Sequence, residues 1–160
     1  HDAGHEIMNH SNTHPHMPQL SAEQMIEEVN SCSDKIEAIT GVRPTLFRPP
    51  YGDYDDRVVS TMRSAGYYTI QWDVDSLDWM NKGSQSVIDR VTSKVSPGSI
   101  VLFHNAAEDT PPALPTIIEE LIKEGYDFVP ISQLIYTENY TMDHTGKQIP
   151  NEKMKNDTQQ

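Results

Sequence analysis

Residues 84–104 read SQSVIDRVTSKVSPGSIVLFH, and this stretch decides the fold class. Its first half spaces branched apolar residues along one helix face, and Ser84 is placed to cap the start of that helix. Pro97 and Gly98 then turn the chain, and the apolar run SIVLFH predicts a short buried strand. A helix, a tight turn and a buried strand in this order form the repeating part of an α/β protein.

The same order recurs on both sides of this stretch. Helices are predicted from Ser21 to Gly41, from Asp55 to Gly66, over residues 113–124 and, as a short piece, over residues 131–136. Strands are predicted within HEIMN (5–9), TLFR (45–48), YYTIQWDV (67–74), SIVLFH (99–104) and YDFVP (126–130). This alternation calls for parallel pairing, in either an open doubly wound sheet or a barrel. Since no glycine-rich phosphate-binding loop follows any of these strands, the barrel is favoured.

Length and composition bound the function. At 160 residues the chain is long enough for one domain with a core, and its net charge of -12 would repel a nucleic-acid backbone. We therefore expect no nucleic-acid partner. The single cysteine, Cys32, excludes an internal disulfide. No apolar run approaches the roughly 18 residues that span a bilayer, so no transmembrane segment is expected, and residues 1–10 lack the features of a signal peptide.

Both ends of the chain differ from its middle. From Thr137 onward the apolar periodicity is lost, so we expect a domain over residues 1–136 followed by a polar, flexible tail over residues 137–160. At the other end, HDAGHEIMNH reads as the last turn of a helix, a cap at Gly4 and an immediate strand. We therefore expect that the domain starts upstream and that its first one or two βα units are missing here.

Unusual polar residues follow the predicted strands. His10 and His14 come after the first strand, Arg48 ends the second, Asp78 lies beyond the third, and His104 ends the fourth. The carboxyl ends of parallel strands share one rim, where ligands bind. We therefore expect these residues to meet in one site.

His10 and His14 belong to HSNTHPH, residues 10–16, in which Pro15 favours a loop and the glutamate of the HExxH zinc motif is lacking. Two neutral imidazoles on a tight loop can hold one zinc ion, and a third ligand, commonly a carboxylate, would leave a position for a hydrolytic water. A solvated histidine-rich turn fits the same spacing, so both interpretations stay open on spacing alone.

The segment around Arg48 also allows two interpretations. The prolines of RPPYGDY, residues 48–54, predict a rigid turn on which Arg48 is a surface charge. Alternatively, Arg48 orients a carboxylate, and the stiff turn fixes Tyr51 so that its backbone amide faces a developing oxyanion.

The segments around Asp78 and His104 also each allow a structural and a functional interpretation. The acids of DVDSLDW, residues 73–79, are either loop acids or, at Asp78, a carboxylate beside the apolar wall of Trp79. His104 follows an apolar run and is either a satisfied core histidine or a general acid with a carboxylate nearby.

Together these segments resemble the polysaccharide deacetylases of the NodB-homology type, carbohydrate esterase family 4. The family motif H-[ST]-x-x-H-P is matched by His10, Ser11, His14 and Pro15, R-x-P-Y by Arg48, Pro50 and Tyr51, D-x-x-D-W by Asp75, Asp78 and Trp79, and L-x-H by Leu102 and His104. The motifs occur in the family's order, and the resemblance runs from the first residues to residue 136.

The resemblance implies a fold and a chemistry. The fold is a deformed (β/α) barrel of the glycoside hydrolase/deacetylase type, with zinc or another divalent ion held by an aspartate and two histidines, here His10 and His14. In such an enzyme a metal-activated water attacks the acetamide of an N-acetylated glycan such as peptidoglycan or a chitin-like polymer. The resemblance also implies an extracellular or cell-surface location.

Residue by residue, the resemblance assigns further roles. Arg48 would hold the catalytic base, and the Tyr51 amide would bind the oxyanion. Asp78 would support His104, the acid that protonates the leaving amine. The acetyl pocket would be lined by Trp79 and Leu102.

One departure from the family bears on activity. Its T-F-D-D segment, which supplies the base and the third metal ligand, is absent, since Asp55-Asp56 begins a helix after the Arg48 motif. Loss of a general base alone costs about 10²–10⁴ in rate, so we expect this chain alone to be poorly active or inactive. The expected partner is a missing N-terminal fragment with that motif. The alternative is a non-catalytic carbohydrate-binding or scaffold domain that has lost its base.

Overall fold

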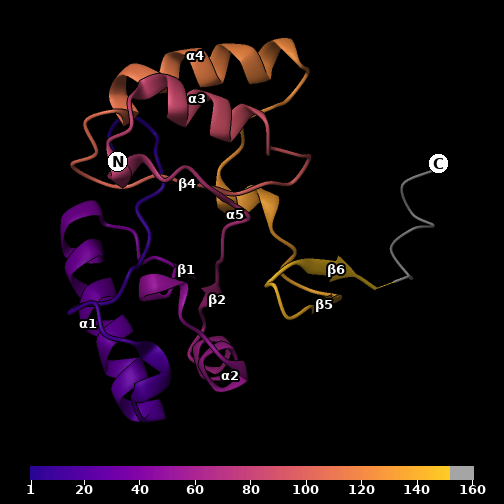
Figure 1. Ribbon diagram of the computed structural model, residues 1–160. Coiled ribbons are helices and arrows are strands. Elements are labelled where there is room, and N and C mark those ends of the chain that lie inside the picture. Colours follow the sequence, from indigo (N-terminus) through magenta and orange to yellow (C-terminus); the bar gives the residue numbers. More distant parts are fainter. Residues whose placement is uncertain (152–160) are drawn as a thin grey trace. The chain divides into compact units, whose positions relative to one another are not determined.

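The computed structural model describes residues 1–151. The described residues form two compact units, one made of His1–Gln71 together with residues 135–151, the other of Trp72–Leu134. Helices alternate with short strands in both units (Figure 1), which confirms the predicted α/β class. Each unit has its own buried apolar core. Among the described residues no helix is both long and apolar enough to cross a membrane.

The first unit contains parallel strands backed by helices. Its helices are η1 (Met17–Gln19), α1 (Ala22–Thr40), η2 (Pro50–Gly52) and α2 (Asp56–Ser64), and its strands are β1 (Leu46–Phe47), β2 (Tyr68–Thr69), β5 (Tyr140–Met142) and β6 (Gln148–Pro150). β1 and β2 pair in parallel with Phe47 opposite Thr69, and Asn9 forms a single parallel bridge to Phe47. The strand predicted at residues 5–9 is therefore reduced to one bridged residue.

Side-chain caps explain where the two longer helices of this unit start. Ser21 Oγ accepts from the Gln24 amide at 3.2 Å, while the Ser21 amide donates to Gln24 Oε1 at 2.9 Å, which confirms the predicted capping box. Asp55 caps α2 by accepting from the Val58 amide at 2.8 Å. The helices and β1 enclose a core of Met17, Met25, Val29, Phe47, Val58, Met62 and Tyr67.

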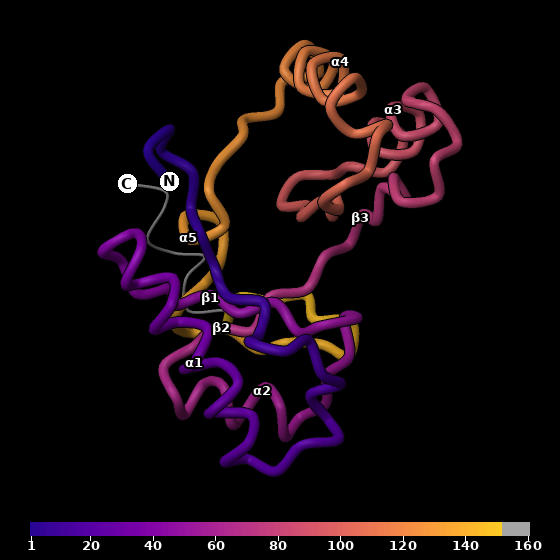
Figure 2. The backbone as a smooth tube through the Cα atoms, turned by 90° about the vertical axis from the view of Figure 1, so that its left-hand side faces the viewer, coloured from indigo at the N-terminus to yellow at the C-terminus, as the bar shows by residue number. Residues whose placement is uncertain are grey.

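The second unit repeats the arrangement of a parallel strand pair and helices. Its strands are β3 (Val74–Asp75) and β4 (Val101–Leu102), and its helices are η3 (Asp78–Met80), α3 (Ser84–Thr92), α4 (Thr110–Lys123) and α5 (Ile131–Leu134). Figure 2 shows α3 and α4 lying side by side. Their buried residues pack on β3 in a core of Val74, Val87, Ile88, Val91, Ala113, Ile117 and Leu121.

Helix starts in this unit differ slightly from the prediction. Ser84 is the first residue of α3 rather than its cap, which is Gly83. α4 begins at Thr110, three residues before the predicted start at residue 113, because prolines 111 and 112 fit the first turn of a helix, where no amide donor is needed.

Two predicted strands also differ from the structure. The run at residues 67–74 divides into β2 and β3, because β2 pairs with β1 whereas β3 pairs with β4. The strand predicted at residues 126–130 is wrong, since this run has no strand geometry and its Phe128 and Val129 side chains are 56% and 47% exposed. A strand needs a hydrogen-bonded neighbour, and none lies beside this run in the described part of the chain.

A β-hairpin follows residue 136. β5 and β6 pair antiparallel, with Tyr140 opposite Pro150, and they belong to the first unit. The polar, flexible tail was predicted over residues 137–160, and the two strands of this hairpin within it were not predicted. The domain boundary after residue 136 and the flexibility of the segment stay predictions, and residues 152–160 lie outside the described residues.

Candidate active site

The loop that carries His10 and His14 begins at Asn9, whose side chain is hydrogen-bonded to helix α1. Asn9 is buried, and its amide nitrogen donates to the Val29 carbonyl at 2.7 Å and to Ser33 Oγ at 2.8 Å. Its side-chain oxygen accepts from the Ser11 amide at 2.8 Å. A buried, fully engaged asparagine therefore fixes the direction in which the chain leaves the strand bridge.

The two predicted metal-ligand histidines lie against each other. The ring centroids of His10 and His14 are 4.9 Å apart with an interplanar angle of 77°. His10 Nδ1 lies 2.6 Å from the Arg48 carbonyl oxygen. A carbonyl can only accept, so Nδ1 must carry the proton, and the neutral ring then has its lone pair on Nε2. This is the backbone contact that commonly orients a metal-binding histidine.

These residues fit part of a metal site. The two imidazoles supply nitrogen donors of the kind that zinc and related ions accept. Within residues 1–151, however, no group of three or more His, Cys, Asp or Glu side chains is arranged to hold a metal ion. The described chain therefore offers two adjacent donors, and a complete site needs a third ligand from elsewhere.

Tyr51 lies beside the histidines on a strained turn. Its ring is 4.5 Å from the His14 ring at 70° and stacks on His16 at 4.1 Å and 10°. Tyr51 has φ 61° and ψ 2°, a left-handed conformation that non-glycine residues rarely adopt. The turn is closed by the Gly52 amide, which donates to Pro49, and by the next amide, which donates to Pro50. These closing bonds do not use the Tyr51 amide, the predicted oxyanion donor.

Arg48 is held at the root of the same turn. Its amide donates to the Asn9 carbonyl at 2.9 Å, and its neighbours Phe47 and Pro49 are buried. The side chain is half-buried, and burial lowers the pKa of the guanidinium. Arginine nevertheless stays charged at any physiological pH, so Arg48 is a fixed cation next to the histidine loop.

The second unit holds a carboxylate–histidine pair. Asp78 is fully buried, with Oδ1 2.7 Å from His104 Nδ1, and Oδ2 accepts from the His104 amide at 2.8 Å. Oδ2 also accepts from Thr110 Oγ1 at 2.6 Å, and Oδ1 from the Trp79 amide at 2.9 Å. The carboxylate therefore fixes both the backbone and the ring of His104, whose side chain is 36% exposed.

Hydrogen bonding keeps Asp78 ionised despite its burial. Burial alone would raise the pKa of Asp78, but hydrogen bonds from the His104 amide, the Thr110 hydroxyl and the His104 ring outweigh it and lower that pKa. An ionised carboxylate can only accept, so His104 Nδ1 carries the proton of this hydrogen bond. The pair can thus position an exposed ring edge for proton transfer.

The predicted pocket residues lie next to this pair. Trp79 directly follows Asp78 in η3 and is 55% exposed, whereas Leu102 on β4 is 7% exposed. Leu102 pairs with Asp75, whose side chain accepts from the Leu77 amide at 3.0 Å. An exposed indole and a buried leucine thus both flank the segment that carries the acid pair.

The structure therefore brings the predicted site residues together in two clusters. The histidine cluster, in the first unit, comprises His10, His14, Arg48 and Tyr51. The acid pair, in the second unit, comprises Asp78 and His104. Their functional roles and the predicted common rim stay predictions.

Two residues that support these clusters were not predicted. Asn9 ends the HEIMN run and Thr110 precedes two prolines, so each carries a weak local signal for a buried turn or a helix start. Their partners are 20 or more residues away in the sequence, and no local pattern reveals such contacts.

Known proteins are similar to this chain in sequence and in structure. A family model for polysaccharide deacetylase matches residues 1–70. The peptidoglycan-N-acetylmuramic acid deacetylase PdaC of Bacillus subtilis is 37% identical over 131 residues, which is 82% of this chain and 27% of PdaC. The chain spans 27% to 64% of the length of four curated relatives.

Solved structures similar to this chain are named as members of carbohydrate esterase family 4. A family 4 carbohydrate esterase from Streptomyces lividans, in complex with acetate, is 32% identical with a TM-score of 0.74, over 94% of this chain and 72% of that one. A family 4 pseudoenzyme from Bacillus anthracis is 37% identical with a TM-score of 0.79, over 83% of this chain and 47% of that one. On this evidence the chain belongs to the polysaccharide deacetylase family, carbohydrate esterase family 4.

Proposed function

We propose that the chain is part of a metal-dependent deacetylase that removes N-acetyl groups from a cell-wall or chitin-like glycan. The observation that carries the proposal is the buried Asp78 carboxylate that holds His104 by its amide and its ring. Deacetylation must protonate an amine leaving group, and an oriented histidine is the usual donor. The names of the relatives, which are peptidoglycan deacetylases, point to the same reaction.

The histidine cluster supplies the other half of the chemistry. His10 and His14 would hold zinc or another divalent ion, which, once bound, activates water and polarises the acetamide carbonyl. The Tyr51 amide would donate to the oxyanion that forms on that carbonyl. Arg48 would orient the carboxylate that acts as the base. Trp79 and Leu102 would receive the acetyl methyl group.

Some parts of this machinery must come from outside the chain. The base and the third metal ligand belong to an Asp-Asp segment that this sequence lacks. We propose that an N-terminal fragment supplies it and that the described strands are part of a deformed (β/α) barrel. An apolar groove of about 360 Å³ lies in the second unit and is lined by α4 and by residues 126–134. Barrel strands are normally covered on both faces, so an uncovered apolar groove supports the proposal that a further part of the barrel packs against this chain.

The substrate and the location follow from the same reasoning. The net charge of -12 does not oppose a glycan without phosphate groups. Deacetylases of peptidoglycan act on the cell wall, so we propose an extracellular or cell-surface place of action.

The test is acetate release from N-acetylated glycan oligomers by the chain combined with a polypeptide that carries the Asp-Asp motif. We expect release that requires a divalent ion and that falls by about 10²-fold or more in His14→Ala. His5→Ala, which changes an exposed histidine near the start of the sequence, is the matched control and should keep the full rate. Release that persists after metal removal would contradict the proposal.

A non-catalytic carbohydrate-binding domain is the second candidate. The absence of a three-ligand metal group among the described residues and the similarity to a family 4 pseudoenzyme both favour it. Saturable oligosaccharide binding without acetate release, even with the Asp-Asp polypeptide present, would establish this alternative.

A further inference from the structure

The hairpin of β5 and β6 lies against two side chains, Tyr54 and Gln71, that adjoin the turn that carries Tyr51. We propose that this hairpin is a positioning element that holds the Pro50–Gly52 turn in its strained conformation, with Gly146 as the contact residue. The role of the Tyr51 amide as an oxyanion donor rests on the proposed function. The effect of the hairpin on the conformation of the turn does not depend on that function.

The tip of the hairpin packs closely on two side chains next to the turn. Gly146 has φ 87°, and a β carbon built on it would lie 3.1 Å from the Tyr54 hydroxyl and 3.2 Å from Gln71 Cβ. Both distances are shorter than ordinary carbon contacts. Glycine is therefore required here both by backbone conformation and by the closeness of its neighbours.

Both contacted side chains connect directly to the Tyr51 turn. Gln71 Nε2 donates to the Gly52 carbonyl at 3.3 Å, and Tyr54 follows that turn two residues later. Burial first, and then the negative charge of Asp143 in the hairpin, raise the pKa of Tyr54. The tip thus lies next to Tyr54 and next to the Gln71 side chain, whose amide donates to the Gly52 carbonyl.

The tip is itself rigid enough to act as a support. Asp143 Oδ1 accepts from the Thr145 amide at 2.8 Å, from Thr145 Oγ1 at 2.6 Å and from the Lys147 amide at 3.1 Å. The Gly146 amide donates to the Asp143 carbonyl at 3.0 Å. A carboxylate that accepts several bonds from its own turn limits the conformations of that turn.

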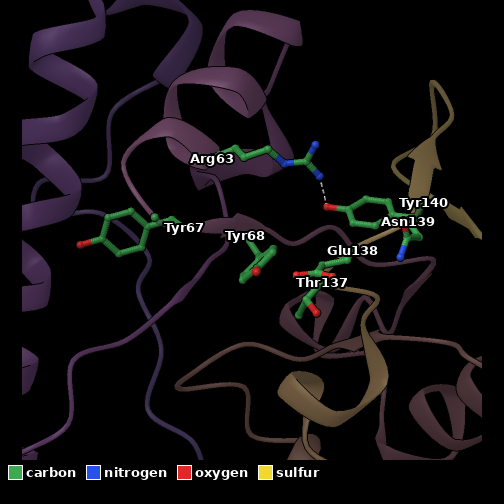
Figure 3. A pocket seen from close by; sticks show the side chains of 8 residues that line it. Arg63, Tyr67, Tyr68, Thr137, Glu138, Asn139 and Tyr140 are labelled. Atoms are coloured by element: carbon green, nitrogen blue, oxygen red, sulfur yellow. Dashed lines mark hydrogen bonds between the residues drawn. The ribbon is translucent and has the colours of Figure 1, made fainter.

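The base of the hairpin is anchored to the same unit. Arg63, in the last turn of α2, hydrogen-bonds to the Tyr140 hydroxyl and lies 5.0 Å from the Tyr140 ring centroid. Figure 3 shows this arginine reaching toward the tyrosine at the rim of a cavity, with Tyr68 and Thr137 nearby. The cavity measures about 290 Å³, and its lining includes Arg63, Tyr68 of β2 and Tyr140. The hairpin is therefore held at both its base and its tip.

A left-handed residue such as Tyr51 persists only where surrounding contacts enforce it. The closing amide bonds of the turn come from Gly52 and Asp53, and their exchange with solvent deuterium reports how often the turn opens. The test is amide hydrogen exchange by NMR on the full chain. Gly146→Ala should speed exchange at both amides by about tenfold or more, with the α1 amides unchanged.

Gly98→Ala is the matched control, because Gly98 has a similar φ of 89° but no heavy atom within 4 Å of an added β carbon. This variant should leave the exchange rates of the Gly52 and Asp53 amides unchanged. Adding Tyr54→Phe to Gly146→Ala removes the nearest clashing atom, so it should restore part of the lost protection, which a merely misfolded hairpin would not allow.

Tyr140→Phe provides a second route, since it removes only the hydroxyl bonded to Arg63 at the base of the hairpin. It should also speed exchange at Gly52 and Asp53. The proposal is overturned if hairpin amides lose protection while those two amides exchange as in the wild type. Since this readout needs no turnover, a failed deacetylase assay leaves it intact.

Discussion

At the scale of single residues, Asp78 combines full burial with ionisation. Its folded-state pKa is lowered by hydrogen bonds, so the ionised form stabilises the fold at pH above the unfolded value of about 3.9. That contribution is lost as the pH falls through the folded-state pKa, because the bonds to the His104 amide and the Thr110 hydroxyl require an acceptor.

Asp78→Asn should therefore lower the free energy of unfolding by about 1–3 kcal/mol at neutral pH, because an amide nitrogen would face a buried donor. The difference from the wild type should shrink below the folded-state pKa, where Asp78 itself is protonated. Urea unfolding followed by tryptophan fluorescence at neutral and acid pH measures both values. Asp89→Asn, at an exposed carboxylate, is the control, and an equal loss in that variant would refute the assignment.

The sequence identifies the candidate site residues more fully than it identifies the residues that support them. His10, His14, Arg48, Asp78 and His104 stand out because polar side chains after apolar runs are unusual. Asn9, Thr110 and Gly146 do not stand out, because their partners are distant in sequence and become visible only when the chain is folded.

At the scale of elements, local capping signals predict helices better than apolar runs predict strands. The capping box at Ser21 specifies the start of α1 through bonds within four residues. The run at residues 126–130 has the composition of a strand, but a strand depends on a partner that composition cannot supply. The hairpin of β5 and β6 was missed because its strands are short and carry few apolar residues.

Ser21→Ala should lower the free energy of unfolding by about 1 kcal/mol, since it removes one half of the capping box. Ser31→Ala, on the same helix, is the matched control. The Ser31 hydroxyl donates to the exposed Glu27 side chain one turn away, so its removal should change stability by less than about 0.5 kcal/mol. Chemical unfolding of the two variants measures the difference, and equal effects would show that the cap does not stabilise α1.

At the scale of the whole molecule, the chain has two units with separate cores and spans only part of the length of its relatives. Sequence patterns predicted the α/β class and the motif order, but not this division, which depends on long-range packing. In the second unit, α4 presents Ile117 to the core at 3% exposure, whereas Ile122 on the same helix is 57% exposed.

These two isoleucines give a direct check on the core of the second unit. Ile117→Ala should destabilise the chain by about 2–5 kcal/mol, because it opens a cavity in a packed core. Ile122→Ala should change stability by less than about 0.5 kcal/mol. Thermal unfolding of the two variants measures the difference, and a large loss of stability in Ile122→Ala would contradict the exposed position.

We propose that His104, held by Asp78, donates a proton during glycan deacetylation. The most direct measurement is the rate of acetate release with the Asp-Asp polypeptide present, compared between the wild type, His104→Gln and the control His5→Gln. We expect His104→Gln to lower the rate by about 10²–10⁴-fold, while metal binding is unchanged and His5→Gln keeps the wild-type rate. A His104→Gln variant that releases acetate at the wild-type rate would contradict it.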